Sequence, residues 1–295
     1  MNKKVHIGVG DWGYIVEDLV RSTSYALTQL GYTVTHGRNT LDPEATILNL
    51  GLTMPLEELQ AVGGRMITYN LEQMRPGNWM AESARATATL KIGYNWDYAK
   101  RNAEVLRSNG LPCSFVPIGF VPPMQSIIKP PQDIDVLFYG YSTDRRLECF
   151  KEIERLGMKM YNSECLEPWH MPWTNELRNH FISRSKVIVN PHAHLENNVF
   201  EMVRCSWLLA NAKCVVAEVN KGDYIEQDIQ ESIVCGSIKD LPELCQLVVE
   251  REDLRKIVED RSLEAFKKRD HVAYVERGMR EYEDWFSVVY CRGGY

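Results

Sequence analysis

The sequence predicts an α/β protein with two Rossmann-like domains that face a cleft. Three observations predict this fold class. Short apolar segments typical of buried strands alternate with amphipathic segments typical of helices through residues 5–117, and the same alternation returns through residues 133–235. A proline-rich stretch separates the two series. The chain of 295 residues is long enough for two hydrophobic cores.

The first series predicts a doubly wound parallel sheet. Its strands are predicted at residues 5–9, 33–35, 46–50, 66–70, 90–94 and 114–117. Amphipathic helices are predicted at residues 15–30, 56–62 and 98–108. Parallel neighbours need a long crossover connection, and strands separated by helices supply one.

Prolines mark the boundary between the two series. Five of them lie between residues 117 and 132. Proline is unfavourable in the interior of a helix or of a central strand, so this stretch is typical of an interdomain linker. We therefore predict an N-terminal domain over residues 1–121, a linker over residues 122–132 and a C-terminal domain over residues 133–271.

The second series repeats the pattern. Strands are predicted at residues 135–139, 159–161, 186–189, 214–217 and 233–235, with helices at residues 145–156 and 175–183 and a further helix that carries Glu201. From Leu241 onward the sequence predicts helices. The last of these, within residues 272–295, is rich in Tyr and Trp, and its mixed charge favours packing on the N-terminal domain over contact with a membrane.

Composition excludes several classes of protein. The formal charge of −6 provides no overall basic field, so any contact with nucleic acid would be local. No apolar run approaches the roughly 20 residues of a transmembrane helix, and residues 1–4 show no signal peptide. The eight cysteines include no CxxC pair, which predicts a cytoplasmic protein without structural zinc.

Residues 8–13 (GVGDWG) fit the G-x-G-x-x-G pattern between a predicted strand and helix, as in dinucleotide-binding proteins. The second strand, however, is not followed by the acidic residue that binds a ribose. It is followed by Arg38, which would suit the 2′-phosphate of NADP, while the bulky Trp12 lies where the turn is tight. An NADP-dependent oxidoreductase is therefore one alternative. The other is a glycine-rich loop that admits a different ligand.

A stronger pattern follows the predicted strand at residues 135–139. Residues 140–146 (GYSTDRR) predict a turn that opens a helix. Backbone N–H groups at a helix N-terminus, the helix dipole and a nearby arginine suit a diphosphate. Gly140, Tyr141, Ser142, Arg145 and Arg146 are therefore candidate ligand contacts. The alternative is an ordinary capped helix with surface arginines.

A second polar segment follows the strand at residues 186–189. Asn190 and His192 come directly after that strand, and Glu201 and Arg204 lie three residues apart, on one face of the next helix. A carboxylate near a helix start can accept hydrogen bonds from both hydroxyls of a ribose. The alternative is an intrahelical ion pair. His192 is a candidate sugar or phosphate contact, or else structural; with His194 it makes a poor metal site.

These segments resemble the GT-B-fold glycosyltransferases. The resemblance is carried by residues 135–141 (DVLFYGY), 145–146 (RR), 186–190 (KVIVN) and 200–204 (FEMVR), and by the shorter segments 69–73, 96–98 and 116–119. It implies that the C-terminal domain binds a nucleotide sugar and that the N-terminal domain binds the acceptor. Glu201 would match the carboxylate that binds the donor ribose. Many retaining members carry two glutamates around seven residues, which this chain lacks, so a retaining or inverting outcome stays open.

Three carboxylates in the first series are candidates for the general base of an inverting transfer. Asp11, Glu72 and Asp97 each follow a predicted strand. The alternative for each is an acid that caps a helix. No metal is expected, because arginines and helix dipoles would neutralise the leaving diphosphate. Asp133 and Asp135 fit D-x-D, but they lie where a strand begins.

The sequence therefore predicts an enzyme that moves a hexosyl or pentosyl group from a nucleoside-diphosphate sugar to an acceptor hydroxyl. The acceptor is a glycan, a small molecule or a modified DNA base, and the sequence does not choose among them. Two other classes stay open. One is the NADP-dependent oxidoreductase, and the other is a non-catalytic two-lobed protein that binds a sugar or a nucleotide.

Overall fold

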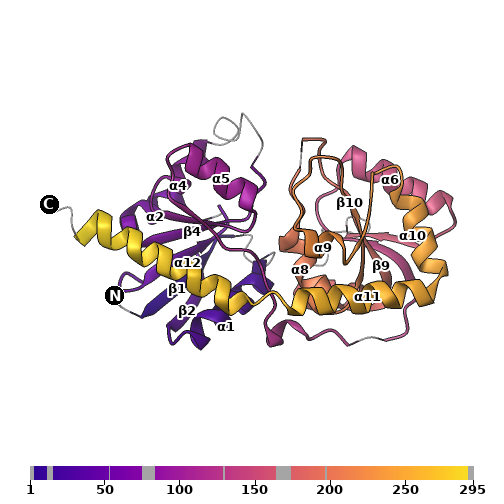
Figure 1. The fold of residues 1–295 in the computed structure, drawn as a ribbon, viewed down its shortest axis with the longest axis horizontal. Coiled ribbons are helices and arrows are strands. Elements are labelled where there is room, and N and C mark those ends of the chain that lie inside the picture. The colour runs from indigo at the N-terminus through magenta and orange to yellow at the C-terminus, as the bar shows by residue number, and fades with distance from the viewer. Residues whose placement is uncertain are drawn as a thin grey trace. The chain divides into compact units, whose positions relative to one another are not determined.

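The chain forms two α/β units. A computed structural model describes residues 3–11, 16–52, 54–74, 84–128, 130–163, 174–196 and 198–291. The first unit comprises Met1–Pro123 together with Asp270–Tyr295, and the second comprises Met124–Arg269 (Figure 1). The C-terminal residues therefore belong with the N-terminal part of the chain.

The first unit contains a parallel sheet of six strands. They are β1 (Lys4–Val9), β2 (Thr33–Arg38), β3 (Thr46–Leu50), β4 (Met66–Asn70), β5 (Tyr94–Asp97) and β6 (Cys113–Phe115). Their order is β2-β1-β3-β4-β5-β6. Every neighbouring pair is parallel. Because β2 and β3 lie on opposite sides of β1, the strand order reverses between β1 and β3.

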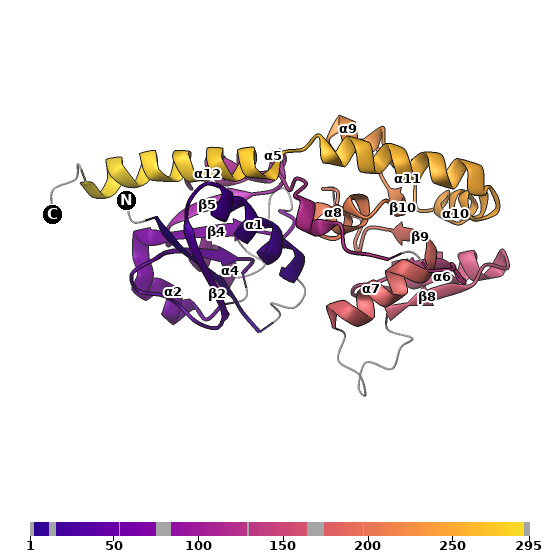
Figure 2. The ribbon, with the colours of Figure 1, turned by 90° about the horizontal axis from the view of Figure 1, so that it is seen from below.

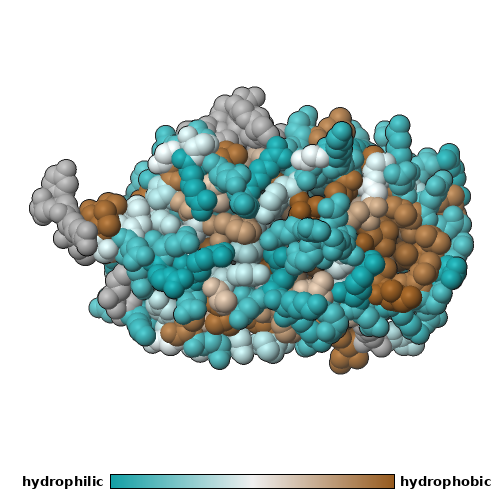
Figure 3. Space-filling model, viewed as in Figure 1, coloured by the Kyte–Doolittle hydropathy of each residue, from teal (hydrophilic) through white to brown (hydrophobic). Residues whose placement is uncertain are grey.

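Helices cover both faces of this sheet. They are α1 (Glu17–Gln29), α2 (Leu56–Val62), α4 (Ala84–Leu90), α5 (Lys100–Ser108) and α12 (His271–Phe286). Shorter elements are the 3₁₀ helices η2 (Gly63–Arg65) and η3 (Pro122–Met124) and the π-helix η5 (Ser287–Cys291). Helices α1 and α12 pack together on one face, while α2 and α4 pack together on the other (Figure 2). In the space-filling view, hydrophilic residues cover most of the outer surface of α12 (Figure 3).

Helix α12 approaches the sheet closely. Its buried residues Val275, Gly278, Met279 and Tyr282 recur at helical spacing and form one apolar face. The indole nitrogen of Trp96 donates to the carbonyl of Gly278 over 3.3 Å. A Cβ at Gly278 would lie 2.6 Å from Val116 Cγ2 and 2.9 Å from the Trp96 ring, so only glycine allows this approach.

The second unit contains a parallel sheet of five strands. They are β7 (Ile134–Phe138), β8 (Met160–Asn162), β9 (Ser185–Asn190), β10 (Cys214–Glu218) and β11 (Val234–Gly236). Their order is β11-β10-β9-β7-β8, and every neighbouring pair is parallel. The strand order reverses between β7 and β9. In open α/β sheets, ligands bind beyond the carboxyl ends of the strands at such a reversal.

The helices of the second unit are α6 (Asp144–Arg155), α7 (Asn175–Arg184), α8 (Met202–Ala210), α9 (Gln227–Gln230), α10 (Leu241–Glu250) and α11 (Glu252–Lys267). One core cluster joins β7, β9 and β10 to α6 and α10, and its members include Val136, Phe138, Val187, Phe150 and Cys245. Full burial of such side chains stabilises the unit by roughly 1.5–3 kcal/mol each. This core holds the strand ends, and hence the loops after them, in place.

The structure corrects three sequence predictions. The strand predicted at residues 90–94 is wrong, because Leu90 ends α4 and β5 begins at Tyr94. The polar Asn95 is accommodated in β5, since its amide donates to the carbonyls of Leu90 and Pro112. Strand β2 runs on to Arg38, and Glu201 precedes α8 as its N-cap residue. The predicted start of the first helix, Ile15, lies outside the described residues.

Candidate functional site

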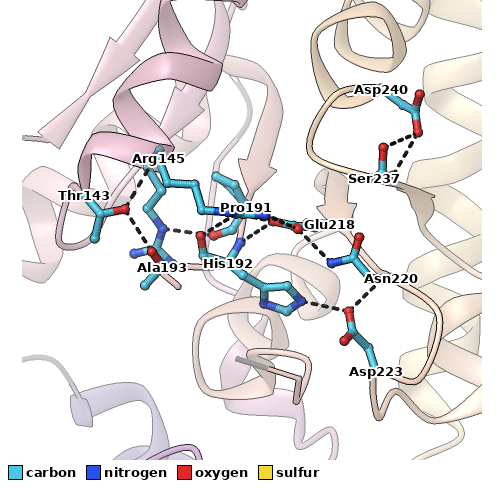
Figure 4. Close-up of polar contacts among 11 residues, drawn as sticks. Thr143, Arg145, Pro191, His192, Ala193, Glu218, Asn220, Asp223, Ser237 and Asp240 are labelled. Carbon is cyan, nitrogen blue, oxygen red and sulfur yellow. Dashed lines mark hydrogen bonds and ion pairs between the residues drawn. The ribbon is translucent and has the colours of Figure 1, made fainter. Parts of the chain in front are cut away.

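Polar side chains gather at the carboxyl ends of β7, β9 and β10, where the strand order of the second sheet reverses. Figure 4 shows those from the loop and helix start after β7, the loop after β9 and the segment after β10. Others come from the start of α8. This is the position at which α/β sheets bind ligands.

Helix α6 begins with a cap that also joins two loops. The Oγ1 of Thr143 accepts from the backbone N–H of Arg146 over 3.4 Å and donates to the carbonyl of Ala193 over 3.0 Å. Just before it, Gly140 has a φ of +134°. A Cβ at Gly140 would lie 2.7 Å from Arg204 Nη2. Glycine is therefore required both by the backbone and by the guanidinium against it.

Arg146 ties three segments together. It is 2% exposed. Its Nη1 donates to the carbonyl of Tyr141 over 2.7 Å, its Nε to the carbonyl of Pro191 over 2.9 Å, and its Nη2 to Oε1 of Glu201 over 3.0 Å. Burial lowers the pKa of Arg146 to about 10, although Glu201 opposes this shift. All three nitrogens are used within the protein, so this side chain is suited to holding the loops.

Glu201 lies between two arginines. Its Oε1 accepts from Arg146, and its Oε2 forms an ion pair with Arg204 Nη1. Arg204 Nη1 also donates to Oδ1 of Asn190 over 2.6 Å. The guanidinium of Arg204 lies over the Phe138 ring, 5.2 Å from its centroid. The predicted helical pair Glu201–Arg204 is thus part of a wider network that reaches β7 and β9.

A second network is built on Glu218, the last residue of β10. Its buried carboxylate accepts from Arg145 Nη1 over 2.6 Å, forms a second contact with Arg145 Nη2, and accepts from the backbone N–H of His192 over 2.9 Å and from Asn220 Nδ2 over 2.8 Å. Burial alone would raise the pKa of Glu218. The hydrogen bonds from Arg145, Asn220 and His192 outweigh burial and hold that pKa below its usual value. The carboxylate is therefore ionised at neutral pH.

His192 extends this network to the segment after β10. Its Nε2 lies 3.1 Å from Oδ2 of Asp223, which also accepts from the backbone N–H of Asn220 over 2.6 Å. Two buried nitrogens at the end of β9, His192 Nδ1 and Asn190 Nδ2, have no hydrogen-bond partner in the described part of the chain. Buried polar atoms normally have a partner, so these two positions suit a ligand.

The structure brings Gly140, Arg145, Arg146, Asn190, His192, Glu201 and Arg204 to one edge of the second sheet. Ser142 turns to β8, where its Oγ accepts from Asn162 Nδ2 over 2.9 Å. Tyr141 is 73% exposed. Sequence reasoning missed Glu218, Asn220 and Asp223. Glu218 could have been found, because it directly follows a predicted strand, just as Asn190 does.

The candidate bases of the first unit have different surroundings. Asp11 is exposed and accepts from Asn39 Nδ2 over 2.7 Å. Glu72 is exposed as well. Asp97 is fully buried, accepts from Asn70 Nδ2 over 2.7 Å, and has its pKa raised by burial to about 8. A general base must reach its substrate, so the burial of Asp97 favours Asp11 and Glu72.

Gly8 and Arg38, which were considered for NADP binding, both contact other residues of the protein. Gly8 lies in β1, where a Cβ would meet Met54 Sδ at 2.6 Å, and packing therefore accounts for this glycine. Arg38 Nη2 lies 3.4 Å from Asp11 Oδ1. Trp12 and Gly13, which complete the glycine motif, lie outside the described residues.

The D-x-D pair at the start of β7 forms ion pairs. Asp133 accepts from Arg184 Nε over 2.8 Å, and Asp135 Oδ1 lies 2.6 Å from Lys186 Nζ. Within the described ranges, no group of three or more His, Cys, Asp or Glu side chains could hold a metal ion. No helix in those ranges is both long and apolar enough to cross a membrane.

No protein-family model and no curated protein matches this sequence. Solved structures match nearly the whole chain. Sucrose-phosphate synthase from Thermosynechococcus elongatus covers 97% of this chain and 100% of its own, with 11% identity and a TM-score of 0.62. HepE from Anabaena, solved with UDP and glucose, covers 96% and 100%, with 9% identity and a TM-score of 0.63. The DNA modifying enzyme β-glucosyltransferase covers 95% and 99%, with 9% identity and a TM-score of 0.59.

These structures share the architecture of the GT-B glycosyltransferases. The chain has the GT-B fold. The predicted α/β fold class is therefore confirmed. Within the GT-B fold of this chain, the polar network around Glu201 and Glu218 lies in the second unit, and Asp11 and Glu72 lie in the first.

Proposed function

We propose that this protein is a glycosyltransferase that moves a hexosyl or pentosyl group from a nucleoside-diphosphate sugar to an acceptor hydroxyl. The observation that carries the proposal is the gathering of Arg145, Arg204 and Glu201 at the strand reversal of the second sheet, beside the N-terminus of α6. An anionic diphosphate is stabilised by arginines and by a helix N-terminus, and a ribose by a carboxylate.

Each residue of the proposed donor site has its own role. Arg145 and Arg204 carry the positive charge that the diphosphate needs, and their side chains are 19% and 16% exposed. In this proposal Glu201, also 16% exposed, accepts hydrogen bonds from the ribose hydroxyls. His192 Nδ1 and Asn190 Nδ2 supply two unfilled hydrogen-bonding positions for the phosphate or the sugar.

The chemical step is a displacement at the anomeric carbon. The acceptor oxygen forms a bond to that carbon while the bond to the diphosphate oxygen breaks, and the electron pair stays on the diphosphate. The acceptor proton passes to Asp11 or Glu72 in an inverting reaction, or to the leaving phosphate in a retaining one. Arginines that stabilise the developing charge on the leaving group lower the barrier.

UDP and UDP-glucose are the first donors to test. HepE was solved with UDP and glucose, and T4 phage β-glucosyltransferase was solved with UDP-glucose. The acceptor is a glycan, a small molecule or a modified DNA base, and the last of these has a precedent in the DNA modifying β-glucosyltransferase. The proposal requires no metal. Because T4 phage β-glucosyltransferase was also solved with UDP and Mn²⁺, assays should include both EDTA and Mn²⁺.

The test is thermal unfolding with UDP, GDP, ADP, their sugar conjugates and NADPH. A ligand at 100 times its dissociation constant adds about 2.7 kcal/mol to the free energy of unfolding. We expect one nucleoside diphosphate and its sugar to stabilise the wild type. Glu201→Gln should reduce this stabilisation, while Glu152→Gln, a change at a partly exposed position of α6, should not.

Two outcomes would contradict the proposal. The first is stabilisation by NADPH alone, which would support the oxidoreductase. The second is binding of a nucleotide sugar without release of free nucleotide in the presence of any acceptor class, measured by chromatography. That result would support a binding protein without catalytic activity. Glu201→Gln is preferred to Glu201→Ala, because the glutamine side chain keeps an oxygen that accepts from the buried Arg146, whereas alanine has none.

A further inference from the structure

Arg145 uses one edge of its guanidinium within the protein. A guanidinium carries five N–H groups in one plane. The Nη1 of Arg145 donates to Glu218 Oε2 over 2.6 Å and to the carbonyl of His192 over 3.0 Å, and its Nη2 donates to Glu218 Oε1. In the described part of the chain, no hydrogen bond involves its Nε. The edge formed by Nε–H and the second Nη2–H is therefore unused.

The neighbouring Arg146 has no such edge. Its Nε, Nη1 and Nη2 each donate to a protein oxygen, and the side chain is almost completely buried. The Arg145 side chain is 19% exposed. A parallel pair of N–H groups on one edge matches two phosphate oxygens. Of these two arginines, Arg145 is therefore the one that can bind an anion through two hydrogen bonds.

Glu218 holds the opposite edge of Arg145. The carboxylate has no exposed surface, and it lies at the end of a central strand. Besides Arg145, it binds the backbone N–H of His192 and the amide of Asn220, so two loops hold it in place. A long side chain such as Arg145 would otherwise sample several rotamers.

We propose that Glu218 is a positioning residue that fixes Arg145 so that its Nε–H and Nη2–H edge binds the diphosphate of the donor nucleotide. Glu218 itself does not touch the ligand. The inference rests on the donor site proposed above and adds to it the residue that orients the phosphate-binding arginine. It also gives the two adjacent arginines different roles, since Arg145 binds the anion and Arg146 holds the loops.

Charge repulsion between Glu218 and the diphosphate would change nucleotide affinity in the opposite direction. A carboxylate near a diphosphate repels it, and if repulsion dominated, removing the charge would tighten nucleotide binding. Positioning predicts that removing the charge weakens binding, because Arg145 is released from its fixed geometry. The sign of the change in affinity therefore decides between the two.

The experiment is isothermal titration of the full chain with UDP, or with GDP or ADP if one of these binds instead. The same proteins are titrated with the matching nucleoside by ligand-observed NMR. We expect Glu218→Gln and Arg145→Lys each to weaken diphosphate binding about tenfold, which is the loss of one charge-assisted hydrogen bond. Nucleoside binding should stay unchanged, because the nucleoside has no phosphate.

The double variant tests whether the two residues act together. Glu218→Gln combined with Arg145→Lys should weaken binding no more than the stronger single change, because the two residues act as one unit. Asp133→Asn is the matched control. It removes another Arg–carboxylate pair of the second unit, with Arg184, at the start of β7. This control should leave diphosphate affinity unchanged.

Three results would overturn the inference while leaving the proposed function intact. They are unchanged or tighter diphosphate binding in Glu218→Gln, an equal loss of nucleoside binding, and fully additive losses in the double variant. If the wild type binds none of the three nucleoside diphosphates, the proposed function fails, and this inference fails with it. If Glu218→Gln does not fold, unchanged diphosphate binding in Arg145→Lys would still overturn the inference, because lysine stays paired with the buried carboxylate but has no Nε–H and Nη2–H edge.

Discussion

Arg146 donates from Nη2 to Oε1 of Glu201 over 3.0 Å, although 55 residues separate the two in sequence. Arg146 lies in the first turn of α6, and Glu201 is the N-cap residue of α8. The pair therefore connects the helix that follows β7 with the helix that follows β9. The loops of the candidate donor site are held by charged and polar contacts, in addition to the apolar core beneath them.

Arg146→Lys should destabilise the second unit. Lysine cannot reach the carbonyls of Tyr141 and Pro191 and the carboxylate of Glu201 at once, because it has a single nitrogen. We expect the free energy of unfolding to fall by about 3 kcal/mol, measured by urea denaturation. Arg155→Lys, at the exposed end of the same helix, is the control and should change it by less than about 0.5 kcal/mol. Equal effects of the two changes would contradict the loop-holding role.

Gly140→Ala should weaken nucleotide binding by displacing Arg204. Its Cβ would lie 2.7 Å from Arg204 Nη2, and the backbone has a φ of +134°. Strain of this kind costs about 1–3 kcal/mol. Gly157→Ala is the matched control, since its φ is +85° and no atom lies within 4 Å of the added Cβ. Both variants should lose stability, but only Gly140→Ala should lose UDP affinity, by about tenfold. Equal UDP affinity in both would contradict the prediction.

Asp97 should make the first unit less stable as the pH rises. An unfolded aspartate titrates near pH 3.9. Burial raises the pKa of Asp97 to about 8 in the folded protein. Between these values the folded state binds more protons, so the free energy of unfolding falls by about 1.4 kcal/mol per pH unit as the pH rises. Hydrogen exchange of β4 and β5 between pH 5 and 8 measures this change.

Asp97→Asn should remove this decline, because the amide does not titrate. The control is Asp253→Asn, an exposed position where the Arg251 side chain holds the carboxyl pKa below its usual value. The control variant should keep the decline. If the decline in stability persists in Asp97→Asn, another titrating group causes it.

His271 should make the first unit less stable as the pH falls. Burial lowers the pKa of this histidine from 6.5 to about 4. Between these values the unfolded state binds more protons, so the free energy of unfolding falls by about 1.4 kcal/mol per pH unit as the pH decreases. The ring lies at the start of α12, where its Nδ1 accepts from the backbone N–H of Gly119 over 3.3 Å.

The effect of His271 is measured by hydrogen exchange of α12 from pH 7.5 down to 4.5. As the pH falls, the backbone amides of α12 should lose less protection in His271→Gln than in the wild type, because the glutamine side chain does not titrate. Above pH 7 the pH dependence of the two proteins should coincide. Parallel curves over the whole range would show that another group causes the acid sensitivity.

Sequence patterns predicted well the strands in which apolar residues predominate. The strands at residues 46–50 and 66–70 were predicted with the observed bounds. Strand β5 was misplaced, because Asn95 and Asp97 are polar and their hydrogen-bond partners are visible only in the tertiary structure. Asn95 donates to two carbonyls, and Asp97 accepts from Asn70. A local pattern does not reveal such partners.

Some residues of the candidate site were likewise predictable from sequence, and others were not. The rule that ligands bind beyond strand ends selected Asn190 and the 140–146 loop from sequence. The spacing of Glu201 and Arg204 predicted their shared face, and the two form an ion pair. Glu218 was overlooked, since its importance lies in its pairing with Arg145, which is 73 residues away in sequence.

The sequence by itself determined where most strands and helices form and which polar residues follow the strands, because both depend on local periodicity and on the alternation of elements. Only the tertiary structure decided which partner each charged group has. Arg145 and Arg146 are adjacent in sequence, yet Arg145 keeps the Nε edge of its guanidinium unused in the described chain, while Arg146 donates from all three of its nitrogens. That difference arises because side chains from strands far apart in sequence meet at the reversal of a parallel sheet.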